Sequence, residues 1–234
     1  MENNTKMKLS TPAAIVVAGF LIMVGIIVTK LPAQNEKLIE DNKNAVVNDI
    51  AIVPISESDH ILGSLETAEA VIIEFSDTEC PWCKKFHPAL KQVVDKYDGK
   101  VAWVYRHSPI ESLHSKARNE ARATECVNNI KGNDAFWQYL DMIYTNTQGN
   151  DSLDPNLLVT YAEKFGITPS EFNKCMVDNK INFNKLINAS IADGKNAGLE
   201  GTPHSVIITK DGKKYPIRGA DVDKLNATLE SLLK

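Results

Sequence analysis

The chain has 234 residues, of which 43% are hydrophobic and 24% are charged, and it contains 12 glycines and 10 prolines. This length suits one folded core with an insertion or a tail, and the composition excludes collagen-like, low-complexity and largely disordered proteins. The formal net charge of -4 provides no overall basic field, and no extended Lys/Arg cluster interleaved with aromatic residues is present. Nucleic-acid binding is therefore not expected.

An uncharged segment lies near the start of the chain, from Leu9 to Thr29. A hydrocarbon layer about 30 Å thick is spanned by roughly 20 helical residues, so this segment is long enough to cross a bilayer. Lys6 and Lys8 precede it, and the positive-inside tendency places this end in the cytoplasm. We expect residues 1–30 to form a single-pass anchor. A cleaved signal peptide is the alternative, although no clean cleavage site follows the apolar run.

The segment after the anchor, residues 31–48, is polar and is expected to link the membrane to a folded domain of residues 49–234. Within that domain, residues 70–75 form a strand-length apolar run rich in β-branched residues, which is typical of a central buried strand. Apolar side chains then recur at helical spacing from about Pro81 to Tyr97.

A second strand is expected at residues 101–105, so that strand, helix and strand begin a parallel sheet. From about 111 to 198 helical patterns follow one another without strands, which indicates an inserted helical subdomain. A capping box at Thr168 to Glu171 begins one of its helices. A strand at 205–209 and a two-residue turn at Asp211-Gly212 predict a hairpin, and an amphipathic helix closes the chain.

Two cysteines, Cys80 and Cys83, follow the buried strand directly and open the helix. A helix N-terminus offers unpaired N–H donors and about half a positive charge, which favour a thiolate, so Cys80 is the predicted nucleophile. Pro81 suits the first helical turn, and the three-residue offset brings Cys83 within bonding distance as the resolving thiol. Exchange would pass through a mixed disulfide between Cys80 and a substrate.

The same pair of cysteines could instead be half of a zinc site or a purely structural disulfide. Zinc usually needs a second pair of ligands at compatible spacing. Cys126 and Cys175 are single and far apart, and His87, His107, His114 and His204 form no closely spaced pair. We therefore expect no metal and no cofactor.

These segments resemble the DsbA-like branch of the thioredoxin superfamily. The resemblance runs from about His60 to the C-terminus and rests on several motifs: Ile-Glu-Phe-Ser-Asp at 73–77, Cys-Pro-Trp-Cys at 80–83, Gly-Thr-Pro at 201–203, Arg-His-Ser-Pro at 106–109, Phe136-Trp137, the alanine-rich helix ending at Cys126, and Phe172 with Cys175. It implies an α/β thioredoxin-like fold with a helical insertion, thiol-disulfide exchange on protein substrates, and residence outside the cytoplasm.

The resemblance also implies roles for individual residues. Pro203 matches a cis-proline that packs beside the cysteines and leaves the backbone of Thr202 free to pair with an extended substrate. Without the resemblance, an ordinary trans proline in a turn would be the simpler reading. Glu74 matches a buried carboxylate that relays a proton to or from Cys83, with a solvated carboxylate at a sheet edge as the alternative.

One departure from the family concerns Trp82, because the strongly oxidising relatives carry His at this position. A Trp offers no cation to the thiolate, so we expect a thiolate pKa less extreme than the value of about 3.5 known for DsbA. Pro81, Trp82 and Thr202 are expected to contact substrate. His204 would contact the thiolate or substrate, or else face solvent. Lys84 is read as part of a solvated face.

The remaining cysteines, Cys126 and Cys175, are expected to form a structural disulfide within the helical insertion. Closing a loop of about 50 residues would stabilise the domain by roughly 3 to 4 kcal/mol and would imply an oxidising compartment. The alternative is two separate buried thiols.

These residues together predict an enzyme that forms disulfides in cysteine-containing secreted or membrane proteins and is reoxidised by a quinone-linked, DsbB-like membrane partner. It would be held in the cell inner membrane by one span, with its catalytic domain on the extracytoplasmic side, periplasmic or extracellular. A reductase or isomerase on the same fold is the first alternative. A redox-inert binding or chaperone module is the second, and it predicts that Cys80→Ser leaves activity intact.

Overall fold

The structure is a computed structural model that describes residues 49–234. The anchor expected at residues 1–30 and the linker expected at residues 31–48 lie outside the described residues. Among the residues that are described, no helix combines the length and the apolar character needed to cross a membrane.

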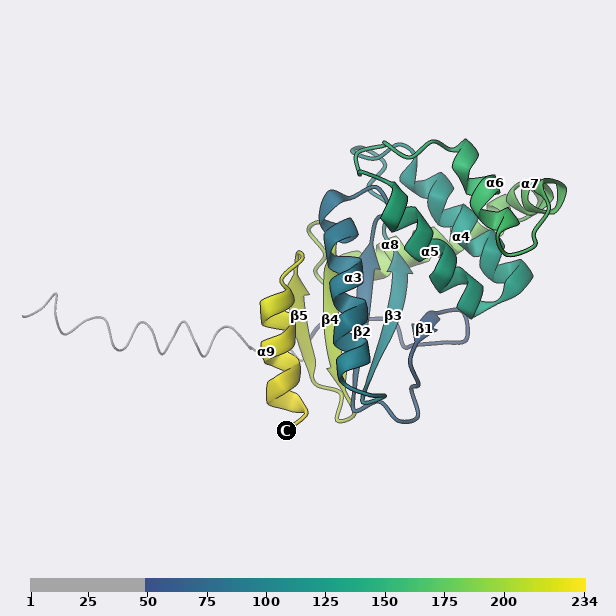
Figure 1. The fold of residues 1–234 in the computed structure, drawn as a ribbon. Helices are drawn as coiled ribbons and strands as arrows, with labels where there is room; N and C mark the ends of the chain where they lie inside the picture. Colours follow the sequence, from purple (N-terminus) through teal and green to yellow (C-terminus); the bar gives the residue numbers. More distant parts are fainter. Residues whose placement is uncertain (1–48) are drawn as a thin grey trace, which may run out of the picture. The chain divides into compact units, whose positions relative to one another are not determined.

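A five-stranded mixed sheet forms the centre of the described domain (Figure 1). Strands β2 and β3 are parallel, whereas the other neighbouring strands are antiparallel. The two apolar runs predicted as strands are confirmed as β2 and β3. The sheet order is β1-β3-β2-β4-β5, with β1 at His60–Leu62, β2 at Ala70–Ser76, β3 at Val101–His107, β4 at His204–Thr209 and β5 at Lys214–Arg218.

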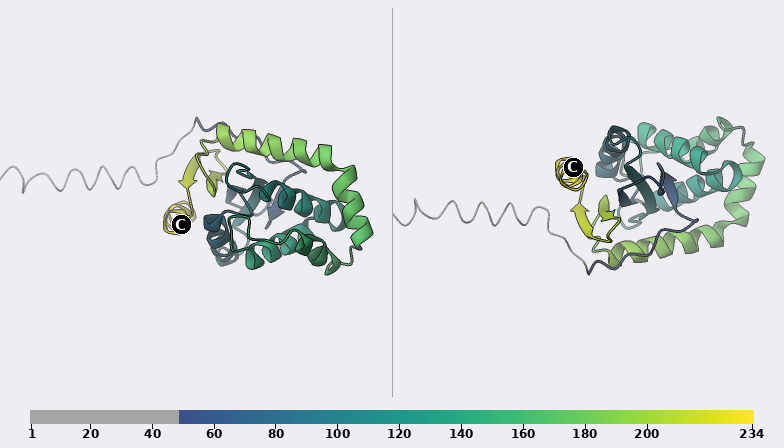
Figure 2. Two further views of the ribbon diagram at one scale, coloured as in Figure 1. Left: turned by 90° about the horizontal axis from the view of Figure 1, so that it is seen from above. Right: turned by 90° about the horizontal axis from the view of Figure 1, so that it is seen from below.

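Helices cover both faces of the sheet. Helices α3 (Pro81–Lys96) and α9 (Val222–Leu232) lie on one face and α8 (Lys180–Asn196) on the other (Figures 1 and 2). Successive strand residues point to opposite faces. Ile72 therefore packs in the core beneath α3, whereas Phe75 packs in a second core on the side of α8. Burial on both faces explains why β2 is an almost continuous apolar run.

The predicted helical insertion lies between β3 and β4. It consists of α4 (Ala117–Lys131), α5 (Asn133–Asn146), α6 (Asn156–Glu163), α7 (Pro169–Asp178) and α8. Helices α4 to α7 share an apolar core of their own. Cys126 and Cys175 are joined by a disulfide that links α4 to α7. The capping box predicted at the start of α7 is present, with Thr168 and Glu171 capping each other.

The β4–β5 hairpin is present, but its turn is longer than predicted. The backbone N–H of Thr209 donates to the carbonyl of Lys213 at 3.1 Å, so the loop contains three residues, 210–212. Gly212 has φ 79°, a left-handed backbone conformation that glycine adopts without steric strain. The two-residue prediction was wrong because a glycine in this conformation also closes a three-residue loop.

Candidate active site at the start of helix α3

Cys80 and Cys83 lie at the N-terminal end of α3. Cys80 is the N-cap residue and Pro81 is the first helical residue. Both cysteines are free thiols in this structure. Cys80 retains 6% of its surface exposed and Cys83 none. Of the two cysteines, only Cys80 keeps part of its surface accessible.

The two thiols differ in acidity. A hydrogen bond from the Cys83 thiol, together with backbone N–H groups at Trp82 and Cys83, lowers the pKa of Cys80 to about 6, although partial burial opposes the shift. Burial raises the pKa of Cys83 well above its usual value. At neutral pH the geometry therefore favours a thiolate on Cys80 and a thiol on Cys83.

The loop before β4 lies beside Cys80. The peptide bond between Thr202 and Pro203 is cis, as the family resemblance implied. The thiol of Cys80 donates to the carbonyl oxygen of Thr202 at 3.3 Å. Pro203 itself is buried. The backbone of Thr202 is thereby placed at the sulfur that a substrate would reach.

Glu74 lies on β2 among the apolar residues beneath α3. It is fully buried, and the indole N–H of Trp103 donates to its Oε2 at 3.0 Å. Within residues 49–234, its Oε1 has no hydrogen-bond partner. Burial raises the pKa of Glu74 to about 7. The alternative of a solvated carboxylate at a sheet edge is excluded, because β2 has a strand on each side.

The residue that departs from the family pattern, Trp82, points outward with 59% of its surface exposed. The ammonium of Lys85 lies 4.7 Å from the centre of its ring. Trp82 is thus an exposed apolar surface next to Cys80 that a substrate can contact, while Pro81 is partly buried at the start of the helix.

His204 does not reach the two cysteines. It pairs in register with Phe75 and is buried, with its Nε2 3.0 Å from the carbonyl oxygen of Ala197. Phe75 belongs to the core on the side of α8, so the His204 ring lies on the sheet face opposite to Glu74. Of the three positions considered from sequence, contact with the thiolate and exposure to solvent do not match this placement, and contact with substrate is not tested by it.

Two buried acidic residues before Cys80 were missed by the sequence analysis. The Oδ2 of Asp77 accepts from the backbone N–H of Ile110 at 2.7 Å and lies 2.9 Å from Nδ1 of His114. Asp77 thereby fixes the turn between β2 and α3 to the segment after β3. The sequence feature that could have indicated this role is the position of Asp77 three residues before Cys80.

Glu79, the second of these residues, binds the loop between α5 and α6. It accepts from the hydroxyl of Thr147 at 2.9 Å and from the backbone N–H of Leu153 at 3.1 Å. Burial and a hydrogen bond to Glu79 raise the pKa of Glu120 to about 9. Glu120 is therefore a neutral acid at neutral pH.

Lys84 was also read incorrectly from the sequence. Its ammonium donates to the carbonyl oxygens of Tyr144 at 3.0 Å and Thr145 at 3.3 Å, at the end of α5. Carbonyl groups at a helix C-terminus lack intrahelical partners and carry partial negative charge, so they attract a cation. Lys84 therefore fastens the active-site helix to the insertion.

The fold and the site define a class of protein: a thioredoxin-like α/β domain with two cysteines at a helix N-terminus and a cis-proline beside them. The chain belongs to the thioredoxin family, because the family model described as "Thioredoxin" matches residues 56–230. Among solved structures, DsbA2 of Pseudomonas aeruginosa is similar at 28% identity, with a TM-score of 0.64 over 76% of this chain and 97% of that chain. BdbD of Bacillus subtilis shares the fold at 21% identity, with a TM-score of 0.62 over 79% of this chain and 98% of that one.

Curated relatives carry two kinds of name. A putative protein-disulfide oxidoreductase of Rickettsia bellii is 28% identical over 181 residues, which cover 73% of this chain and 65% of that protein. The Na(+)/H(+) antiporter NhaA 3 of Salinispora tropica is 30% identical over 130 residues, or 55% of this chain. The matched part is only 19% of the antiporter's length, so the chain corresponds to a small portion of that relative.

Proposed function

We propose that this protein is a thiol-disulfide oxidoreductase that forms disulfides in extracytoplasmic proteins through Cys80 and Cys83. The observation that carries the proposal is the contrast between the two sulfurs. Cys80 is partly exposed and its pKa is lowered to about 6, whereas Cys83 is fully buried and its pKa is raised. An accessible, acidic thiol is a good leaving group and nucleophile, and a fully buried neighbour is suited to resolve the mixed disulfide.

In the oxidising direction the enzyme starts with a Cys80-Cys83 disulfide. A substrate thiolate attacks the sulfur of Cys80, and Cys83 leaves as a thiolate that takes up a proton, for which Glu74 is the proposed donor. A second substrate thiolate then attacks the substrate sulfur of the mixed disulfide and releases Cys80. Two substrate thiols lose two electrons and two protons, and the enzyme ends as the dithiol.

The residues around the sulfurs supply substrate contacts in this proposal. The backbone of Thr202 and the ring of Pro203 would receive an extended peptide by strand-like pairing. Pro81 and Trp82 would line the same approach, since Trp82 presents an exposed aromatic face next to Cys80. His204 is not assigned a substrate contact, because its side chain lies on the other face of the sheet.

The proposal extends to the protein's surroundings. The uncharged segment at residues 9–29 supports a single inner-membrane anchor, with residues 49–234 on the extracytoplasmic side. The disulfide between Cys126 and Cys175 agrees with an oxidising compartment. A quinone-linked, DsbB-like membrane protein would reoxidise the dithiol, since each cycle leaves two electrons on the enzyme.

A reductase or isomerase is the second candidate. A Cys80 pKa of about 6 lies closer to the value of about 7 known for thioredoxin than to the value of about 3.5 known for DsbA. A less stabilised thiolate makes the dithiol form less favoured and the enzyme a weaker oxidant.

The test is oxidative refolding of a reduced protein that needs disulfides, with the oxidised full-length chain as the stoichiometric oxidant. The proposal predicts that substrate disulfides appear together with two free thiols on the enzyme, and that Cys80→Ser abolishes both. Refolding by Cys80→Ser at the rate of the unmodified protein would instead support a redox-inert chaperone.

A further inference from the structure

Three side chains of metal-binding type meet away from the candidate active site: His60 on β1, His107 at the end of β3, and Glu125 on α4. The Nε2 of His60 lies 2.7 Å from Oε1 of Glu125, and the Nε2 of His107 lies 3.0 Å from the same oxygen. The three candidate ligand atoms all lie within 4.8 Å of one another, and the three residues are buried. We propose that they bind a divalent transition-metal ion, with zinc as the best-fitting metal.

The ligand set matches the coordination chemistry of zinc. Two imidazoles and one carboxylate are the protein ligands of a familiar class of zinc site, which leaves a fourth position to water. Zinc-ligand bonds of about 2.0 to 2.2 Å in a tetrahedron place neighbouring ligand atoms about 3.4 Å apart. The two distances to Glu125 are shorter than this by less than 1 Å. Small side-chain rotations would therefore let the ion replace the protons that now lie between Glu125 and the two histidines.

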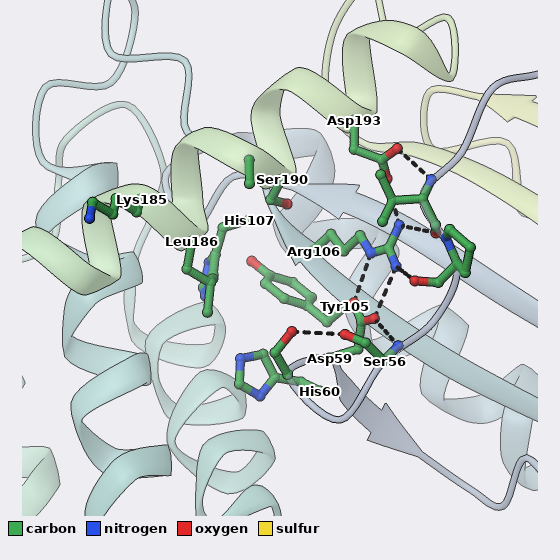
Figure 3. Close-up of a pocket in the computed structure, with 14 residues that line it drawn as sticks. Ser56, Asp59, His60, Tyr105, Arg106, His107, Lys185, Leu186, Ser190 and Asp193 are labelled. Atoms are coloured by element: carbon green, nitrogen blue, oxygen red, sulfur yellow. Dashed lines mark hydrogen bonds and ion pairs between the residues drawn. The ribbon is translucent and has the colours of Figure 1, made fainter.

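A cavity lies beside two of the three residues of the cluster. His60 and His107 line a pocket of about 380 Å³ that also contains Asp59, Arg106 and Asp193 (Figure 3). The Nε of Arg106 donates to Asp59 at 2.7 Å, and its guanidinium also pairs with Asp193. Arg106 is thus paired with two acids, and Lys185 is the other Lys or Arg side chain that lines the pocket.

The surroundings also hold the ligands in place. The His60 ring stacks on Phe136, with ring centres 3.5 Å apart and planes inclined by 11°. A bound ion would join two strands of the sheet to α4, and so fasten the helical insertion to the core. Sequence spacing did not indicate this site, because its ligands come from three separate elements.

The experiment is calorimetric titration of zinc chloride into the oxidised full-length chain in detergent, so that Cys80 and Cys83 cannot act as zinc ligands. We expect one zinc per chain. Binding should weaken at least about tenfold in Glu125→Gln and in His60→Gln, because each removes one of three protein ligands. His204→Gln is the matched control, since it changes a buried histidine outside the cluster and should bind zinc like the unmodified chain.

Equal zinc affinity in the cluster variants and the unmodified chain would overturn the proposal, as would the lack of stoichiometric binding. If the cluster variants fail to fold, cobalt chloride added to the unmodified oxidised chain decides the question. Strong visible absorption at one equivalent, typical of four-coordinate cobalt, supports the site. The weak spectrum of six-coordinate cobalt contradicts it.

Discussion

The thiol of Cys80 donates a hydrogen bond to the carbonyl oxygen of Thr202 at 3.3 Å, across 122 residues of sequence. The contact joins the start of α3 to the loop before β4. A sulfur that carries no hydrogen cannot make this bond, so the Thr202 carbonyl is free whenever Cys80 is a thiolate or part of a disulfide, including a mixed disulfide with a substrate. That carbonyl would then be able to accept from the backbone of the same substrate.

The acidity of Cys80 should depend on Cys83. Hydrogen bonding from the Cys83 thiol is the largest cause of the lowered Cys80 pKa, so Cys83→Ala should raise that pKa from about 6 towards the ordinary value of 9.0. The thiolate absorbance of the Cys83→Ala protein can be followed against pH, with the Cys80→Ala protein as the blank. An unchanged midpoint in Cys83→Ala would show that groups other than the Cys83 thiol set the pKa.

Substitution of Glu74 should change stability in a pH-dependent way. Burial raises its pKa from 4.5 to about 7 in the folded protein, so the folded state binds more protons than the unfolded state between these values. Stability therefore falls as pH rises through this window, by about 3 kcal/mol at most. Glu74→Gln cannot ionise, and we expect it to unfold at higher denaturant concentration than the unmodified protein at pH 8 but not at pH 4.

The same Glu74→Gln variant should slow disulfide exchange around neutral pH, since it removes the proposed proton donor to Cys83. The measurement is the rate at which a substrate thiol opens the Cys80-Cys83 disulfide, followed against pH. A rate profile identical to that of the unmodified protein would leave Glu74 with a structural role alone.

The two acids Glu79 and Glu120 provide a matched pair of substitutions. Glu79 accepts hydrogen bonds from Thr147 and Leu153, so Glu79→Gln should lower the free energy of unfolding by about 1 to 3 kcal/mol. Glu120 has a pKa raised to about 9 and is neutral at pH 7, so Glu120→Gln should cost much less. Denaturant unfolding at pH 7 compares the two variants, and a larger loss in Glu120→Gln would contradict the raised pKa of Glu120.

Removal of the disulfide in the insertion should affect stability but not redox chemistry. Cys126 and Cys175 are separated by 49 residues, and closing a loop of this size stabilises a protein by roughly 3 to 4 kcal/mol. Replacing both by Ala should lower the denaturant midpoint while leaving the Cys80-Cys83 potential unchanged. A shift in that potential would mean that α4 and α7 influence the active site.

The parts of the structure that follow from sequence are those set by local pattern. The strands at 70–75 and 101–105 and the helix after Cys80 were predictable, because continuous β-branched runs and helical spacing reflect burial directly. Strand β1 was not predicted, because it contains only three residues, His60–Leu62, and begins with a histidine. Such a short segment carries no periodicity.

The parts that could not be predicted depend on tertiary register. Whether His204 faces the cysteines is decided by its pairing with Phe75, since a shift of one residue would turn it to the opposite face. The partners of Glu79 come from the loop between α5 and α6, 68 to 74 residues later in the chain. Hydrophobic periodicity reports on short windows of sequence, so it cannot join positions that far apart.

The central claim is tested most directly by the equilibrium reduction potential of Cys80 and Cys83 in the full-length chain, titrated against glutathione with the Cys126-Cys175 disulfide followed separately. A disulfide-forming enzyme predicts a potential near or above about -150 mV. A potential near about -270 mV would contradict that direction and favour a reductase. If Cys80 and Cys83 formed no disulfide at any ratio of reduced to oxidised glutathione, thiol-disulfide exchange at this site would be ruled out.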